Sequence, residues 1–133
     1  MSITQLTVTP TGEILFNDTA IANSVDGIKA SAATLNSVTI DNTAGLTGMY
    51  LKLYNAPSGS VVVGATVPDE IIYGPAGSEI SVSYWTEAEE QTEIFEAVIG
   101  KAFPIALSAT CETSGATGAT GPSSNVIATI SYQ

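Results

Sequence analysis

The fold class rests on one stretch of the chain, MYLKLYNAPSGSVVVGATVPDEII at residues 49–72. Its first six side chains fall alternately on two faces, Met49, Leu51 and Leu53 on one and Tyr50, Lys52 and Tyr54 on the other. Alternation with a period of two is the pattern of a β-strand. The residues Pro57-Ser58-Gly59 then predict a turn, and the β-branched run at 60–67 predicts a second short strand.

Similar strand signals recur along the whole chain, at spacings of about 8–12 residues. We expect further strands within 4–10, 12–18, 35–45, 69–77, 78–85, 102–114 and 125–133. Within each of three strands, the alternation predicts that a set of residues shares one face. The sets are Val38 and Ile40; Ile80, Val82 and Tyr84; Val126, Ala128, Ile130 and Tyr132. By contrast, residues 20–33 are rich in small side chains and predict an irregular segment with a turn at Asp26-Gly27.

Together these strands predict one all-β domain over residues 1–133. We expect a single β-sandwich, jelly-roll or immunoglobulin-like, of about eight short strands. Residues 1–16 are predicted to form an N-terminal arm or hairpin, and the last strand should hold the C-terminus in a sheet. The Gly/Thr-rich stretch at 115–123 is predicted to be a flexible loop between the last two strands.

One acidic segment, WTEAEEQTEIFEAVIGKAF at 85–103, breaks the strand pattern. Thr86 precedes Glu89 by three residues, which is the spacing of a capping box, and helix formers follow. We favour a short acidic helix over about 87–97. The alternative is an acidic loop that enters a strand at FEAVI, residues 95–99.

The charge balance excludes some partners. The chain has three lysines, no arginine and thirteen acidic residues, for a net charge of −10. Nucleic-acid binding needs cations against the phosphates, and anionic membranes attract basic segments, so we expect neither partner. Only 12% of the residues are charged, against about 25% in a typical soluble domain. A surface so poor in charge suits a protein that packs against copies or partners.

The residue types give little chemistry. There is no histidine, so Cys111 has no imidazole to activate it, and we expect a half-buried thiol in a strand. The glutamates at 87–96 lack the glycine turn and the alternating Asp and Asn of a calcium loop, which favours a solvated face or a protein contact. An isopeptide bond from Lys52 or Lys101 to an asparagine is not selected by any spacing. We therefore predict no catalytic, cofactor-binding or metal-binding residues.

Residues 50–84 have the sequence YLKLYNAPSGSVVVGATVPDEIIYGPAGSEISVSY. This stretch resembles a recurrent pattern in small virion proteins of tailed bacteriophages, and the likeness extends over roughly 45–133. The matching features are the strand 50–54, Val63-Gly64 with Thr66 and Pro68, the strand 71–73, Pro75-Ala76-Gly77, Gly100 with Phe103, ALSATCET at 106–113, the loop GATGATGPSS and the final NVIATISYQ. The acidic segment 86–97 is longer and more acidic than the usual passage there.

The resemblance implies a non-enzymatic β-sandwich virion protein, a cement or decoration protein on the capsid surface. The N-terminus of the chain lacks the basic start and apolar core of a signal peptide. We therefore expect the protein to be made in the host cytoplasm and to reach the virion by assembly. The implied partners are the major capsid protein and copies of itself, as a dimer or trimer, with no cofactor.

The residues that we predict to form contacts are Ile3, Leu6, Val8, Trp85, Glu89, Glu90 and Phe95. Two other roles stay open. One is a tail, neck or head-fibre component, and the other is a carbohydrate- or receptor-binding module.

Overall fold

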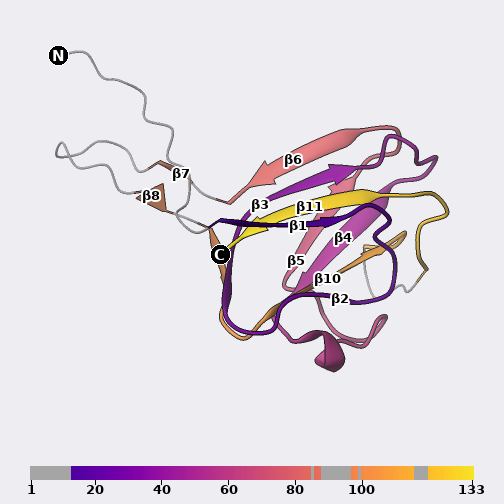
Figure 1. The fold of residues 1–133 in the computed structure, drawn as a ribbon. Coiled ribbons are helices and arrows are strands. Elements are labelled where there is room, and N and C mark those ends of the chain that lie inside the picture. The colour runs from indigo at the N-terminus through magenta and orange to yellow at the C-terminus, as the bar shows by residue number, and fades with distance from the viewer. Residues whose placement is uncertain (1–12, 85, 88–96, 99, 116–119) are drawn as a thin grey trace, which may run out of the picture.

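The computed structural model describes residues 13–84, 86–87, 97–98, 100–115 and 120–133. Within them the chain forms two antiparallel sheets packed face to face (Figure 1). Sheet A has five strands: β1 (Ile14–Asp18), β11 (Ile127–Tyr132), β3 (Ala33–Asp41) and β6 (Glu79–Ser83) in that order, with β9 (Lys101–Phe103) also paired to β3. Sheet B has four strands, in the order β2 (Asp26–Lys29), β10 (Leu107–Glu112), β4 (Met49–Tyr54) and β5 (Glu70–Gly74). The predicted all-β sandwich is confirmed.

The core lies between the two sheets, where the alternation predicted it. Sheet A contributes Val38 and Ile40 from β3 and Ala128 and Ile130 from β11, each at most 1% exposed. Sheet B contributes the inward residues of β4 and β10: Met49, Leu51, Leu53, Leu107, Ala109 and Cys111. Burial of these apolar side chains is the main favourable term in folding.

Two strands, β6 and β9, pair one after the other with the same side of β3. β6 pairs with its residues 37–41 and β9 with its residues 33–35. Between them lies Asn36, beside an irregularity in the β3–β11 register. The Tyr84 amide donates to the Asn36 carbonyl at 2.8 Å, and the Gly100 amide donates to the Tyr84 carbonyl at 3.1 Å. The chain therefore leaves and re-enters sheet A at the same point of β3.

The pair formed by β7 (Thr86–Glu87) and β8 (Ala97–Val98) begins just beyond that point. The predicted acidic helix is therefore wrong at its two ends, because residues 87 and 97 face each other across an antiparallel pair. Residues 88–96 lie outside the described part of the chain. A strand pair joins two ends that the joint at Asn36 already holds together, whereas a helix would separate them along its axis.

Two strand predictions are wrong in opposite directions. The segment 20–33 was expected to be irregular but contains β2, in which Asp26 pairs with Ala109 and Gly27 with Ser108. The neighbouring strand β10 provides this pairing, and no local pattern announces it. The predicted strand at 60–67 is absent, because the amides of Ala65 and Thr66 both donate to the Val62 carbonyl and close a turn.

Other boundaries differ in smaller ways. The strand expected at 102–114 is divided at Pro104 into β9 in sheet A and β10 in sheet B, since proline has no amide hydrogen for a ladder. The strand expected at 12–18 is β1, and it pairs with β11. Its expected hairpin partner at 4–10 and most of the 1–16 arm lie outside the described residues. The C-terminus is held as predicted, by two hydrogen bonds between the backbones of Gln133 and Thr34.

Candidate functional site

The outward face of β4 and β10 in sheet B is buried, although it points away from the core. Because Leu51, Leu53, Ala109 and Cys111 point inward, the alternate residues point outward. These outward residues are at most 1% exposed: Lys52, Tyr54, Ser108, Thr110 and Glu112. The connection from β4 to β5, which contains the 3-10 turn η1 (Ser58–Ser60), contributes to the cover. The Ser108 hydroxyl donates to the Ala56 carbonyl at 2.7 Å, and Val61 is 8% exposed.

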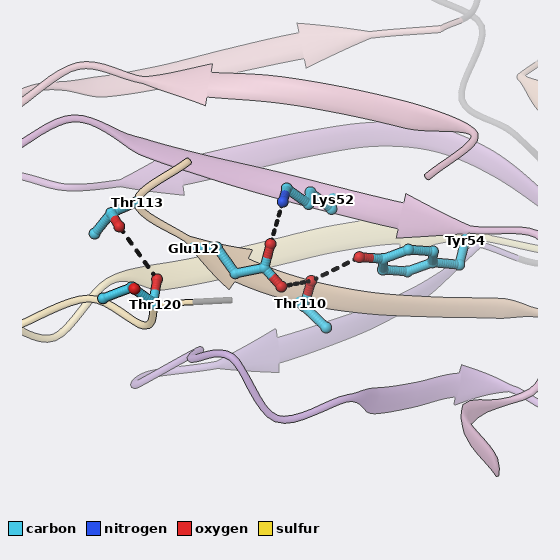
Figure 2. A network of polar contacts seen from close by, with 6 residues as sticks. All are labelled: Lys52, Tyr54, Thr110, Glu112, Thr113 and Thr120. Carbon is cyan, nitrogen blue, oxygen red and sulfur yellow. Dashed lines mark hydrogen bonds and ion pairs between the residues drawn. The ribbon is translucent and has the colours of Figure 1, made fainter. Parts of the chain in front are cut away.

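Four of these residues form a polar network across the two strands (Figure 2). The Lys52 ammonium contacts the Glu112 carboxylate through Oε2. The Thr110 hydroxyl donates to Glu112 Oε1 at 3.2 Å. Because its hydrogen is used there, Thr110 accepts from the Tyr54 hydroxyl, also at 3.2 Å. Burial, and to a smaller extent the Glu112 charge, raise the pKa of Tyr54, while the Thr110 bond lowers it.

This network is built to hold strands together. Lys52 lies directly opposite Thr110, and Glu112 is its diagonal neighbour on the same face. A fully buried ion pair repays the cost of removing both charges from water only when further hydrogen bonds support it, as Thr110 does here. None of the four side chains is exposed enough to meet a dissolved substrate. The arrangement is structural.

Cys111 points into the core from β10. It is fully buried, not half-buried as expected from the sequence. Burial raises the pKa of its thiol to about 12, with smaller contributions from the charges of Glu112 and Asp18. The thiol is therefore protonated at neutral pH, and because the thiolate is the reactive form, Cys111 is a packing residue.

Two side-chain contacts join the sheets along their edges. At the β1–β2 edge, Asp26 shares a hydrogen bond with Asp18, and burial followed by this bond and the Asp18 charge raise the pKa of Asp26 to about 7. At the β9–β5 edge, Lys101 Nζ lies 2.8 Å from Glu70 Oε2 and donates to the Asp69 carbonyl at 3.0 Å. In the described ranges, no group of three or more His, Cys, Asp or Glu side chains could hold a metal ion.

Two pairs of the exposed apolar side chains lie on strands, at opposite sides of the sandwich, while Leu46, Val62, Val67 and Ile105 are exposed in connections between strands. Ile14 and Leu15 on β1 are 49% and 66% exposed, and Ile71 and Tyr73 on β5 are 40% and 49% exposed. Among the described strands, β1 lies at an edge of sheet A and β5 at an edge of sheet B. The Asp18–Asp26 contact places β1 beside β2, and the Lys101–Glu70 contact places β5 beside β9, at the other edge. The two apolar edges therefore face in different directions.

All seven predicted contact residues lie outside the described residues, and so those predictions stay predictions. The points where their two segments join the sandwich are described. β1 begins at Ile14 opposite Tyr132, Tyr132 lies opposite Leu35, and the 84–100 connection begins and ends beside Asn36. The described residues that flank the two segments therefore lie at the same end of sheet A (Figure 1).

Sequence reasoning missed the residues that the structure makes conspicuous. Lys52 and Glu112 were assigned to no site, since their contact depends on pairing between strands that are far apart in sequence. The apolar edge of β5 had a visible signal, the alternation of Ile71 and Tyr73 beside Ile72 in DEIIYG.

No family model, no curated protein and no solved structure matches the chain. Among the described residues, no helix has the length and apolar character needed to cross a membrane.

Proposed function

We propose that this chain is a non-enzymatic structural protein of a bacteriophage virion, made in the host cytoplasm, that binds the capsid surface as a cement protein. In this role it bridges neighbouring subunits of the major capsid protein and contacts copies of itself. Many weak contacts of this kind add up over a shell, because each bound copy holds the next surfaces at high effective concentration.

The observation that carries the proposal is the pair of apolar edges on opposite sides of one rigid sandwich. A bridging protein must bind at least two neighbours at once, and β1 and β5 offer separate apolar surfaces for this purpose. Edge strands of soluble proteins usually carry lysines or other devices that prevent pairing. Neither β1 nor β5 contains a lysine.

The distribution of positive charge gives further support. Two of the three lysines, Lys52 and Lys101, are used in contacts with glutamates of the same chain. The outer surface consequently has little positive charge with which to attract phosphates. A protein surface that carries few charges and several exposed apolar residues is better matched to a protein partner.

The experiment is binding of the purified chain to shells assembled from the major capsid protein of its own particle. We expect co-sedimentation with the shells and a higher temperature of shell disruption. Leu15→Lys should weaken binding, while Leu46→Lys, at a position 93% exposed in a turn, is the matched control. Failure to bind shells, together with recovery in a tail, neck or head-fibre fraction, would replace the capsid role with that alternative.

The carbohydrate-binding alternative also has a structural observation to test. Tyr50 and Tyr73 form an aromatic pair on the outer face of sheet B, with ring centroids 5.0 Å apart. Their planes are tilted by 47°, so they do not make a flat stacking platform for a sugar ring. We expect no glycan binding by the isolated protein, and a glycan hit that is lost in Tyr73→Ala would support this alternative instead.

A further inference from the structure

We propose that the free edge of β5 pairs with β5 of a second copy, antiparallel, about a two-fold axis at Ile72. The pairing would join the four-stranded sheet B of each copy into one continuous sheet. This names the copy-to-copy contact of the proposed virion role. Its test needs no capsid, so either proposal can fail without the other.

The edge of β5 is short, and Lys101 of β9 contacts it only at its start, at the Asp69 carbonyl and the Glu70 carboxylate. β5 pairs with β4 along one side, and no described strand occupies the other side. Pro68 and Pro75 lie just outside the strand, and each lacks the amide hydrogen that would extend a ladder. The pairing is thereby confined to residues 69–74, which contain neither lysine nor proline.

The side chains on this edge are apolar and are held in place. Ile71 and Tyr73 are partly exposed on the outer face, while Ile72 points into the core and is 6% exposed. The Tyr73 ring packs against Tyr50, and its hydroxyl lies so close to Gly48 that a side chain there would have no room. An aromatic side chain that is already ordered loses little conformational entropy on binding.

The residues favour the register in which the two-fold axis passes through Ile72. In an antiparallel pair about this axis, the numbers of two opposite residues sum to twice 72, so Ile71 lies opposite the partner's Tyr73 and Glu70 lies opposite the partner's Gly74. An axis at residue 71 would bring Asp69 against the partner's Tyr73. An axis at residue 73 would put Ile71 opposite the partner's Pro75, which cannot donate. Of these three registers, the central one alone pairs Ile71 with Tyr73 in both directions, with no carboxylate and no proline opposite either side chain.

The charge of the chain argues for the same edge. With a net charge of −10, two copies repel each other unless they meet where the charge is compensated. Glu70 is the only charged residue in β5, and Lys101 of the same chain neutralises it at 2.8 Å. By comparison, β6 exposes Glu79, Ser81 and Ser83, and is polar along its outer side.

A second copy is the occupant because the edge complements itself. Isologous contacts require a patch in which residue i meets j and j meets i, and the Ile71–Tyr73 exchange satisfies this rule. The paired area is that of a single short strand, so the dimer should be weak and concentration-dependent, and should gain strength when copies are held side by side.

Sedimentation velocity at rising protein concentration tests the contact. We expect a monomer–dimer equilibrium that Tyr73→Lys or Ile71→Lys weakens at least about tenfold. Leu46→Lys carries the same charge change at an exposed turn position and should leave the equilibrium unchanged. Thermal unfolding of each variant checks that the fold is retained.

Cysteine cross-linking tests the register. The double variant Ile71→Cys/Tyr73→Cys should give a disulfide-linked dimer under mild oxidation, because each new cysteine faces the other type across the axis. Ile71→Cys alone should stay largely monomeric, and the native Cys111 is buried. A native chain that remains monomeric at every concentration, or a dimer that the β5 variants do not weaken, would overturn the proposal.

Discussion

The outward faces of the two sheets follow the same alternating pattern but end in different environments. At the centre of sheet A the outward side chains of Thr39, Ser81 and Thr129 are small and not buried, and the hydroxyls of Thr39 and Ser81 meet at 3.0 Å across β3 and β6. On sheet B the corresponding positions hold a lysine and a glutamate, Lys52 and Glu112, which are almost completely buried.

The difference comes from what lies over each sheet. The connection between β4 and β5 folds back on sheet B, where Ser108 is bonded to Ala56. Alternation states which residues share a face, but it does not state whether that face meets water. Substitutions on the covered face of sheet B should therefore lower the free energy of unfolding more than substitutions on the exposed face of sheet A.

The largest loss should follow from breaking the buried pair on sheet B. Lys52→Met leaves the Glu112 carboxylate buried without a compensating charge, and we expect a loss of about 3–5 kcal/mol in the free energy of unfolding. Urea denaturation followed by tryptophan fluorescence or circular dichroism gives this value.

Two controls sharpen this prediction. Lys52→Met/Glu112→Met removes both charges, and it should recover most of the loss, since apolar replacement of a buried pair is often neutral. Lys101→Met breaks a partly exposed pair and should cost about 0–1 kcal/mol. If Lys52→Met and Lys101→Met cost the same, Lys52 is hydrated in solution and the proposed contrast between the faces is wrong.

Sheet A should be most sensitive in its backbone, at the joint where β6 gives way to β9. Gly100 has φ +82°, and a side chain there would collide with Thr34 and the Leu35 carbonyl. We expect Gly100→Ala to cost about 1–3 kcal/mol in unfolding free energy, measured by the same denaturation.

Gly77→Ala separates the two causes, because Gly77 also has a positive φ, +69°, but has open space around it. Gly59→Ala, in open space without a positive φ, should be nearly neutral. Equal losses at Gly77 and Gly100 would show that the close approach to β3 contributes nothing.

The alternating strands were predictable because their signal is local. Val38 and Ile40 in β3, and Ala128 and Ile130 in β11, are buried at the spacing that the sequence shows. The same local reasoning failed at β2 and at residues 60–67. In the first case the strand forms because β10 is beside it, and in the second a turn at Val62 outweighs β-branched propensity.

The candidate site was much less predictable. The contact between Lys52 and Glu112 joins residues sixty positions apart, and it depends on the register of β4 against β10. No local pattern encodes that register. The seven contact residues that the sequence did suggest belong to the segments that leave one end of sheet A, outside the described residues.

The free energy of unfolding should depend on pH through Asp26, which contacts Asp18 at the edge where the two sheets meet. The pKa of Asp26 is about 7 in the fold, above its ordinary value of 3.8, because of burial and the bond to Asp18. Between these values the folded chain keeps a proton that the unfolded chain has released. Stability should therefore fall as pH rises from about 4 to about 7 and then level off.

Asp26→Asn removes this dependence without removing the side chain. After allowance for the partial exposure of the site, the variant should be about 1 kcal/mol more stable than the native chain above pH 7. Denaturation curves of both proteins across this pH range give the difference, which cancels the general effect of the net charge. A difference that does not change with pH would show that Asp26 is ionised throughout.

The smallest effect should be on the outer face of sheet A. Thr39→Ala removes the cross-strand contact with Ser81 in partly exposed surroundings, and we expect a loss of about 0.2–1 kcal/mol. Water can satisfy the Ser81 hydroxyl that remains, which is not so for the Glu112 carboxylate on sheet B. A loss at Thr39 as large as that of Lys52→Met would mean that a partner or another segment covers this face in solution, and the contrast between the two sheets would then disappear.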